Sequence, residues 1–198
     1  MSIKQAARLA KDAAIRLAAV KSDIKNKALS DIARSLEKRS AEIVAANQED
    51  LVRSEKESLA APLLKRLKFD EAKIKETCEG LQSLIGLADP VGETLSAMEL
   101  DQGLELYKVS SPIGVIGVVF ESRPDALVQI SFLCLKSGNA VLLKGGSEAS
   151  ATNRILAEII QEASVQAGIP DGWLTLLETR ADVAEMLAMD AFIDLIIP

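Results

Sequence analysis

A regular alternation of short apolar runs with helix-length segments, from residue 113 to residue 198, constrains the fold of this chain most strongly. The predicted strands are Ile113–Phe120, Ala140–Lys144, 173–178 and 192–197, and the predicted helices are 124–136, 148–167 and 181–189. This pattern predicts an α/β fold with a parallel sheet, because parallel strands need a long crossover connection. Ligands of such sheets bind beyond the carboxyl ends of the strands, so we expect functional side chains at that edge.

Residues 1 to about 88 predict a helical region. One apolar stripe repeats every four residues and consists of Ile24, Ala28, Ile32 and Leu36. Charged residues on the other faces complete an amphipathic helix. Asp70 is a predicted N-cap for a later helix, which ends near Gly86.

A hairpin is predicted between the helical region and the alternating segment. Its arms, Leu95–Leu100 and Leu104–Val109, flank a turn in which Gly103 can adopt the positive φ that short turns need. Two interpretations fit: an interface element that contacts another chain, or an edge hairpin packed on its own domain. The predicted organisation is a helical region 1–93, a hairpin 94–110 and an α/β domain 111–198.

Composition argues against several classes of function. The chain is 48% hydrophobic but only 3% aromatic and has a net charge of −6, which favours an aliphatic core and disfavours a nucleic-acid-binding surface. No apolar run is long enough to cross a membrane, and the start MSIKQAARLA lacks the apolar core of a secretory signal. We therefore expect a soluble cytoplasmic protein. The chain has no histidine, which excludes histidine triads and most transition-metal sites, so no metal is expected.

The two cysteines are predicted to lie in the core. Cys78 and Cys134 are far apart in sequence and form no CxxC motif, so neither a disulfide framework nor a zinc knuckle is indicated. Each shares a helical face with apolar residues, Ile74 and Leu81 for the first and Leu127 and Ile130 for the second. Buried cysteines of this kind behave as small hydrophobic residues rather than as nucleophiles.

Lys144 and the four residues after it form the first candidate binding site. Gly145 and Gly146 would let a ligand approach the backbone, and Ser147 with Glu148 would begin a helix whose free N–H groups favour an anion. The alternative is an ordinary strand-to-helix turn, with a lysine that extends to solvent and a serine cap. The usual G-x-G-x-x-G dinucleotide motif is absent from the sequence.

Ser122 and Arg123 form the second candidate, at the carboxyl end of the first predicted strand. Pro124 suits the first position of the helix that follows. A helix N-terminus next to a guanidinium is an anion site suited to a carboxylate or an acyl phosphate. The alternative is that Ser122 and Asp125 cap the helix while Arg123 pairs with Glu121.

Two phrases in this region carry a family resemblance. PIGVIGVVFESRP, residues 112–124, and CLKSGNAVLLKGGSEA, residues 134–149, resemble the γ-glutamyl phosphate reductases (glutamate-5-semialdehyde dehydrogenases) of proline biosynthesis. More distantly they resemble the aldehyde dehydrogenase superfamily, which usually has NFP and KPSE where this chain has SRP and KGGSEA. The resemblance covers essentially the whole chain.

The resemblance implies an aldehyde dehydrogenase-like fold with a Rossmann-like sheet, whose hairpin is part of an oligomerisation arm, and hence a homo-oligomer. It implies NADPH as cofactor, with Lys144 and the Ser147–Glu148 pair at the adenosine ribose and its 2′-phosphate. It places Ser122 where the superfamily has an oxyanion-stabilising asparagine. The implied reaction is reduction of L-glutamyl 5-phosphate to L-glutamate 5-semialdehyde, in which a cysteine thioester receives hydride.

The family's nucleophilic cysteine and its pyrophosphate-binding glycine turn fall after the segment that matches this chain. We therefore expect the native chain to continue past Pro198, the fold to be incomplete at its C-terminus, and the 198 residues alone to be inactive. The apolar run 192–197 supports this expectation, because it is typical of a strand in a sheet interior. Two alternatives stay open: a non-catalytic assembly or binding relative, and another acyl-reducing aldehyde dehydrogenase.

Overall fold

The computed structural model describes residues 2–121 and 123–198. The helical region comprises α1 (Ile3–Leu17), α2 (Ser22–Lys38), α3 (Ser40–Lys56), α4 (Ala61–Leu67) and α5 (Glu71–Ile85), followed by the hairpin strands β1 (Thr94–Asp101) and β2 (Leu104–Val109). The rest comprises β3 (Val115–Val119), α6 (Pro124–Lys136), β4 (Ala140–Lys144), the 3₁₀ turn η1 (Ser147–Ala149), α7 (Ser150–Gln166), β5 (Leu174–Leu176), α8 (Arg180–Leu187) and β6 (Leu195–Ile197).

The sheet is parallel, with strand order β5-β4-β3-β6, which confirms the predicted fold class. β4 is buried along its whole length and β3 nearly so, as their continuous apolar sequences predict. Gly117 in β3 lets α8 pack closely on the sheet, since a Cβ there would lie 2.8 Å from the Met186 sulfur.

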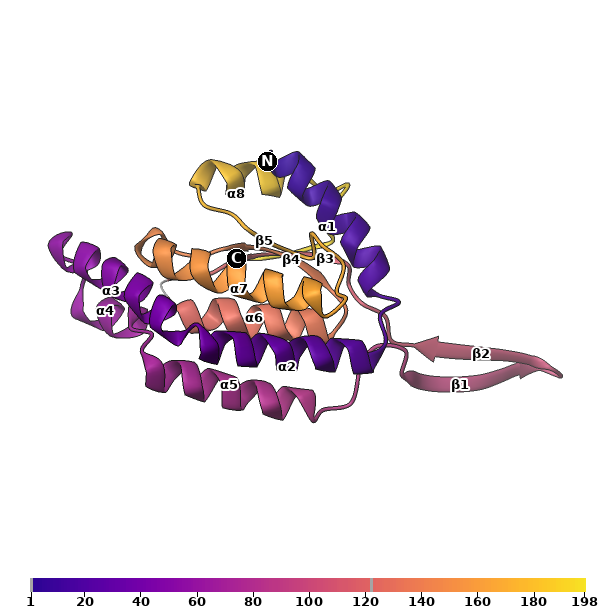
Figure 1. Ribbon diagram of the computed structural model, residues 1–198. Coiled ribbons are helices and arrows are strands. Elements are labelled where there is room, and N and C mark those ends of the chain that lie inside the picture. The colour runs from indigo at the N-terminus through magenta and orange to yellow at the C-terminus, as the bar shows by residue number, and fades with distance from the viewer. Residues whose placement is uncertain (1, 122) are drawn as a thin grey trace.

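Helices cover both faces of the sheet (Figure 1). α1 and α8 lie over one face, and α6 and α7 lie over the other, with α2 and α5 packed outside them. α1 buries small side chains, Ala7, Ala10, Ala13 and Ala14, which allow close approach to the strands.

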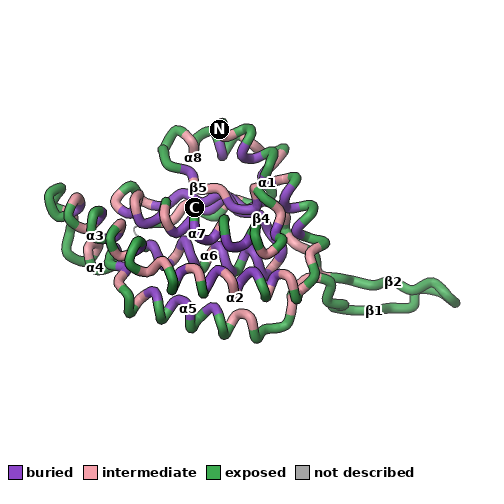
Figure 2. Tube along the Cα trace, viewed as in Figure 1, coloured by how far each residue is buried: buried purple, intermediate pink, exposed green. Residues whose placement is uncertain are grey.

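One continuous apolar core joins the helical region to the sheet (Figure 2). It extends from Ile32 of α2 and Leu81 of α5, through Leu135 of α6, to Leu142 of β4. The helical region therefore contributes directly to the packing of the α/β part. The division into units 1–93, 94–110 and 111–198 stays a prediction.

The hairpin projects away from this body (Figure 1). Every residue of β1 and β2 is exposed, so the hairpin does not pack on its own domain. Gly103 has φ +76°, as the predicted turn requires.

The C-terminal elements differ from the prediction in their bounds. Phe192 and Ile193 form a turn that closes α8, and both donate backbone hydrogen bonds to the Met189 carbonyl at 3.0 Å. β6 is thus shorter than predicted and lies at an edge of the described sheet. Leu195 and Ile197 are 38% and 46% exposed there, so β6 is not an interior strand of the described sheet. The predicted helix 148–167 begins later, at Ser150, after a 3₁₀ turn.

Candidate functional site

The two candidate loops lie side by side at the carboxyl edge of the sheet. Val119 at the end of β3 is in register with Lys144 at the end of β4, and the Phe120 N–H donates to the Lys144 carbonyl at 3.0 Å. The loops that begin at Phe120 and at Gly145 therefore leave the sheet together, as the parallel arrangement predicts.

Arg123 is held by Asp125 rather than by Glu121. Its Nη2 donates to Asp125 Oδ2 at 2.8 Å, and this hydrogen bond raises the pKa of the guanidinium. Glu121 Oε2 instead lies 3.6 Å from Arg66 Nη1, so the alternative interpretation, an Arg123–Glu121 pair, is wrong. Arg123 remains half exposed at the edge while Asp125 is buried, an arrangement that presents an oriented cation to a ligand. Ser122 lies outside the described residues.

Lys144 is buried, with only 8% of the residue exposed. Its ammonium donates to the Gly145 carbonyl and does not extend to solvent. The pKa of Asp182 in α8 is lowered mainly by a hydrogen bond from the backbone N–H of Thr179. The positive charge of Lys144 lowers it further, so Lys144 also acts on α8. Lys144 is thus a buried residue between the β4–α7 and β5–α8 loops.

The two glycines lie close to side chains of their own chain. A Cβ on Gly145 would lie 2.3 Å from the Asn153 amide nitrogen and 3.0 Å from the Phe120 ring. A Cβ on Gly146 would lie 2.3 Å from the Glu148 carboxylate. The loop therefore folds tightly on its own side chains, where the sequence suggested space for a ligand.

A carboxylate from α3 already occupies the N-terminus of α7. Asp50, fully buried, accepts hydrogen bonds from the N–H of Ala151 at 3.2 Å and of Thr152 at 2.8 Å, and from the Thr152 hydroxyl at 2.7 Å. Negative charge at a helix N-terminus satisfies free N–H groups and the helix dipole. The sequence suggested that a ligand anion binds at the start of this helix. At these two amides the Asp50 carboxylate of the chain itself takes that place.

Arg53, one turn after Asp50, holds the loop that precedes α7. Its Nη2 lies 2.5 Å from Asp50 Oδ1, and it donates at 3.1 Å to the carbonyls of Ser147 and Glu148 and to the Ser150 hydroxyl. Sequence reasoning missed both residues. Their only signal is an Asp–Arg pair three residues apart, which an ordinary exposed helix shows equally well.

Asn153 has a buried acceptor at this edge. The residue is 2% exposed, and its Oδ1 has no hydrogen-bond partner among the described residues. Further out, Arg154 of α7 pairs with Glu178 after β5 at 2.9 Å, which connects α7 to the β5–α8 loop.

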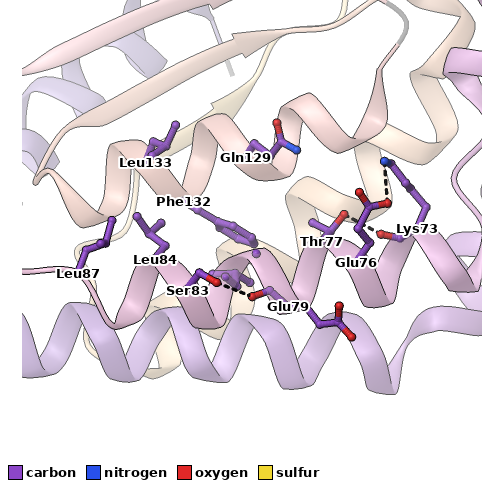
Figure 3. A pocket seen from close by; sticks show the side chains of 12 residues that line it. Lys73, Glu76, Thr77, Glu79, Ser83, Leu84, Leu87, Gln129, Phe132 and Leu133 are labelled. Carbon is purple, nitrogen blue, oxygen red and sulfur yellow. Dashed lines mark hydrogen bonds and ion pairs between the residues drawn. The ribbon is translucent and has the colours of Figure 1, made fainter.

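Several hollows in the surface lie away from this edge. One of about 720 Å³ runs between α5 and α6, with Leu84 and Phe132 directed into it and the Lys73–Glu76 ion pair at its rim (Figure 3). It has an apolar floor and none of the candidate residues, so we do not assign chemistry to it.

Neither cysteine is activated. Burial raises the pKa of Cys134 to about 12, and burial, with Glu37 nearby, raises that of Cys78 to about 11. Both thiols therefore stay protonated at neutral pH, in keeping with their predicted place in the core. Among the described residues, no group of three or more possible metal ligands gathers, and no helix is long and apolar enough to cross a membrane.

Similarity to known proteins identifies the family. The model of the aldehyde dehydrogenase family matches residues 1–197. The chain belongs to the aldehyde dehydrogenase family. Enzymes of this family are oxidoreductases that use nicotinamide cofactors.

More specific likenesses confirm the resemblance seen in the sequence. The chain is 66% identical to the γ-glutamyl phosphate reductases of Acetivibrio thermocellus and Pelotomaculum thermopropionicum over 198 residues, which is 100% of this chain but 46% of each relative. The crystal structure of γ-glutamyl phosphate reductase from Thermotoga maritima matches with TM-score 0.96 and 34% identity, over 100% of this chain and 48% of that one. The chain thus spans about half the length of these relatives.

A more distant structure shows the fold alone. A probable aldehyde dehydrogenase from Listeria monocytogenes matches with TM-score 0.73 at 15% identity, over 98% of this chain and 40% of that one.

Proposed function

We propose that this protein takes part in the NADPH-dependent reduction of L-glutamyl 5-phosphate to L-glutamate 5-semialdehyde, a step of proline biosynthesis, and supplies the nucleotide-binding edge. The observation that carries the proposal is the 66% identity to γ-glutamyl phosphate reductases over the whole chain. The adjoining strand ends of β3 and β4, with Arg123 and Lys144 beyond them, support it. A proposed biosynthetic enzyme with a water-soluble substrate is expected to work in the cytoplasm.

The residues at this edge fit the adenosine end of NADPH. Lys144 is a buried donor, and Asn153 Oδ1 is a buried acceptor that lacks a partner among the described residues. Both suit ribose hydroxyl groups, which donate and accept hydrogen bonds. We propose that Lys144, the Gly145–Gly146 backbone and Ser147–Glu148 hold the adenosine ribose and its 2′-phosphate. NADPH, when bound, supplies the hydride.

Arg123 is the proposed contact to the acyl substrate. Its guanidinium is oriented by the buried Asp125 carboxylate and stays half exposed next to the start of α6. It would bind the substrate carboxylate or acyl phosphate, both of which match the donor geometry of a guanidinium. Ser122, its neighbour, is proposed to contribute to the oxyanion site.

Binding of NADPH to the purified chain, followed by fluorescence, tests the cofactor assignment. We expect Lys144→Ala to weaken binding about 10- to 100-fold, because one hydrogen bond to a charged group is worth about 1.5–3 kcal/mol. Lys108→Ala, in the exposed hairpin, is the matched control and should bind like the wild type. If the wild type and Lys144→Ala bind NADPH with equal affinity, Lys144 does not contact the cofactor.

A further inference from the structure

Two charged side chains of α3 anchor the loop between β4 and α7, about 95 residues later in the chain. Asp50 accepts hydrogen bonds from the N–H groups of Ala151 and Thr152 in α7, and Arg53 donates to the carbonyls of Ser147 and Glu148. The Asp50–Arg53 ion pair joins these two sets of contacts into one network.

Burial makes this network different from an ordinary surface ion pair. Asp50 is fully buried and each of its oxygens accepts at least one hydrogen bond, so its charge is fully compensated. Asp31 and Arg34 in α2 have the same residue types and spacing, but there the carboxylate is 23% exposed and the arginine 72%, against 0% for Asp50 and 41% for Arg53. Pairs of that exposed kind contribute little to stability.

The contacts of Arg53 also set the direction of the loop peptides. In a planar trans peptide the carbonyl and the following N–H point in opposite directions. The carbonyl of Ser147 points at Arg53, so the N–H of Glu148 points away from α3. Arg53 thus fixes which peptide groups of residues 147–149 face the side opposite α3.

We propose that Arg53, oriented by Asp50, is a positioning residue for the adenosine end of the nucleotide site. This rests on the proposed function, which assigns Ser147 and Glu148 to the cofactor. Arg53 acts through the loop and does not touch the nucleotide. The nucleotide site would then depend on the helical region as well as on the α/β part.

The experiment compares the wild-type chain with Arg53→Ala, Arg53→Lys and the matched control Arg34→Ala. Calorimetric titration with 2′,5′-ADP measures binding of the adenosine end, and amide hydrogen exchange measures the order of residues 147–152. We expect Arg53→Ala to weaken binding about tenfold or more and to speed exchange in this segment. Arg53→Lys should recover part of both, since its ammonium can still donate to the two carbonyls. Arg34→Ala should change neither.

Each outcome decides a separate claim. If the wild type binds 2′,5′-ADP and Arg53→Ala binds it equally well, the positioning role of Arg53 is wrong while the proposed function stands. If exchange of residues 147–152 is the same in Arg53→Ala and wild type, Arg53 does not order the loop, and positioning is again wrong. If the wild type itself does not bind, the cofactor assignment fails and the positioning role fails with it. Unchanged exchange outside this segment in Arg53→Ala would show that the fold is intact.

Discussion

At the scale of single residues, several charged side chains interact with partners that are remote in sequence. Arg53 reaches Ser147, Asp50 reaches Thr152, and Lys11 of α1 pairs with Asp194 at 2.7 Å. Such pairs leave little trace in local sequence pattern, because charged residues on amphipathic helices are expected in any case. Their function becomes visible only when burial and partners are known.

Gly145 supports a residue-scale prediction. Gly145→Ala should destabilise the protein by about 1–3 kcal/mol, because the added methyl group overlaps Asn153 and Phe120 in a tightly packed loop. Gly80→Ala in α5 is the control: no atom lies within 4 Å of its Cβ, so removing a helical glycine should stabilise by about 0.5–1 kcal/mol. Urea unfolding of both variants measures the difference. A Gly145→Ala variant as stable as the wild type would show that the loop can relax.

At the scale of elements, the hairpin is the part that does not pack against the other helices and strands of the described structure. Met98 and Leu106 are paired across β1 and β2, and both are more than half exposed, as are Leu100 and Leu104 nearby. An exposed apolar ribbon with open strand edges is typical of an interaction surface. This supports the homo-oligomer that the family resemblance implies, and we propose that the hairpin is its contact.

Sedimentation measures the mass that this assignment predicts. The wild-type chain should be larger than a monomer, and the double variant Met98→Glu/Leu106→Glu should shift to the monomer, because buried unpaired carboxylates oppose association. Leu187→Glu is the control, since Leu187 is a similarly exposed apolar residue on α8. Oligomers that persist in the double variant would show that the interface between chains does not lie in the hairpin. Oligomers that form without any nucleotide binding would favour the non-catalytic assembly alternative.

At the scale of the whole molecule, the chain holds a proposed nucleotide edge but no activated thiol. Both cysteines are buried with raised pKa values, and the reaction proposed here needs a thiolate nucleophile. The chain also spans about half the length of the reductases it resembles. These observations support the proposal that the 198 residues do not catalyse the reaction alone.

A direct assay checks this. Purified chain is incubated with glutamate 5-semialdehyde, phosphate and NADP⁺, and the formation of NADPH is followed by absorbance. We expect no formation above a blank without protein, with a complete γ-glutamyl phosphate reductase as positive control. Sustained formation would mean that a nucleophile other than a free thiolate operates within these residues.

More of the fold than of the candidate site could be predicted from the sequence. The parallel sheet, a hairpin with Gly103 at its turn and the buried cysteines all follow from local patterns of apolar residues and glycine. The exposure of the hairpin was only one of the two interpretations that the sequence allowed. The partner of Arg123, the role of Gly145 and the Asp50–Arg53 anchor did not follow from such patterns. Each depends on which distant side chain fills a particular space.

The sequence by itself determined the class of fold and the family, because hydrophobic periodicity and short motifs act over neighbouring residues. It also predicted, as a hypothesis, that a ligand binds at the carboxyl ends of the strands. Only the tertiary structure decided how that edge is built. Packing α3 against α7 brings the Asp50 carboxylate to the helix N-terminus, so the charge that the sequence left for a ligand is supplied there by the protein. Long-range packing, rather than local pattern, decides which polar groups stay open to a partner.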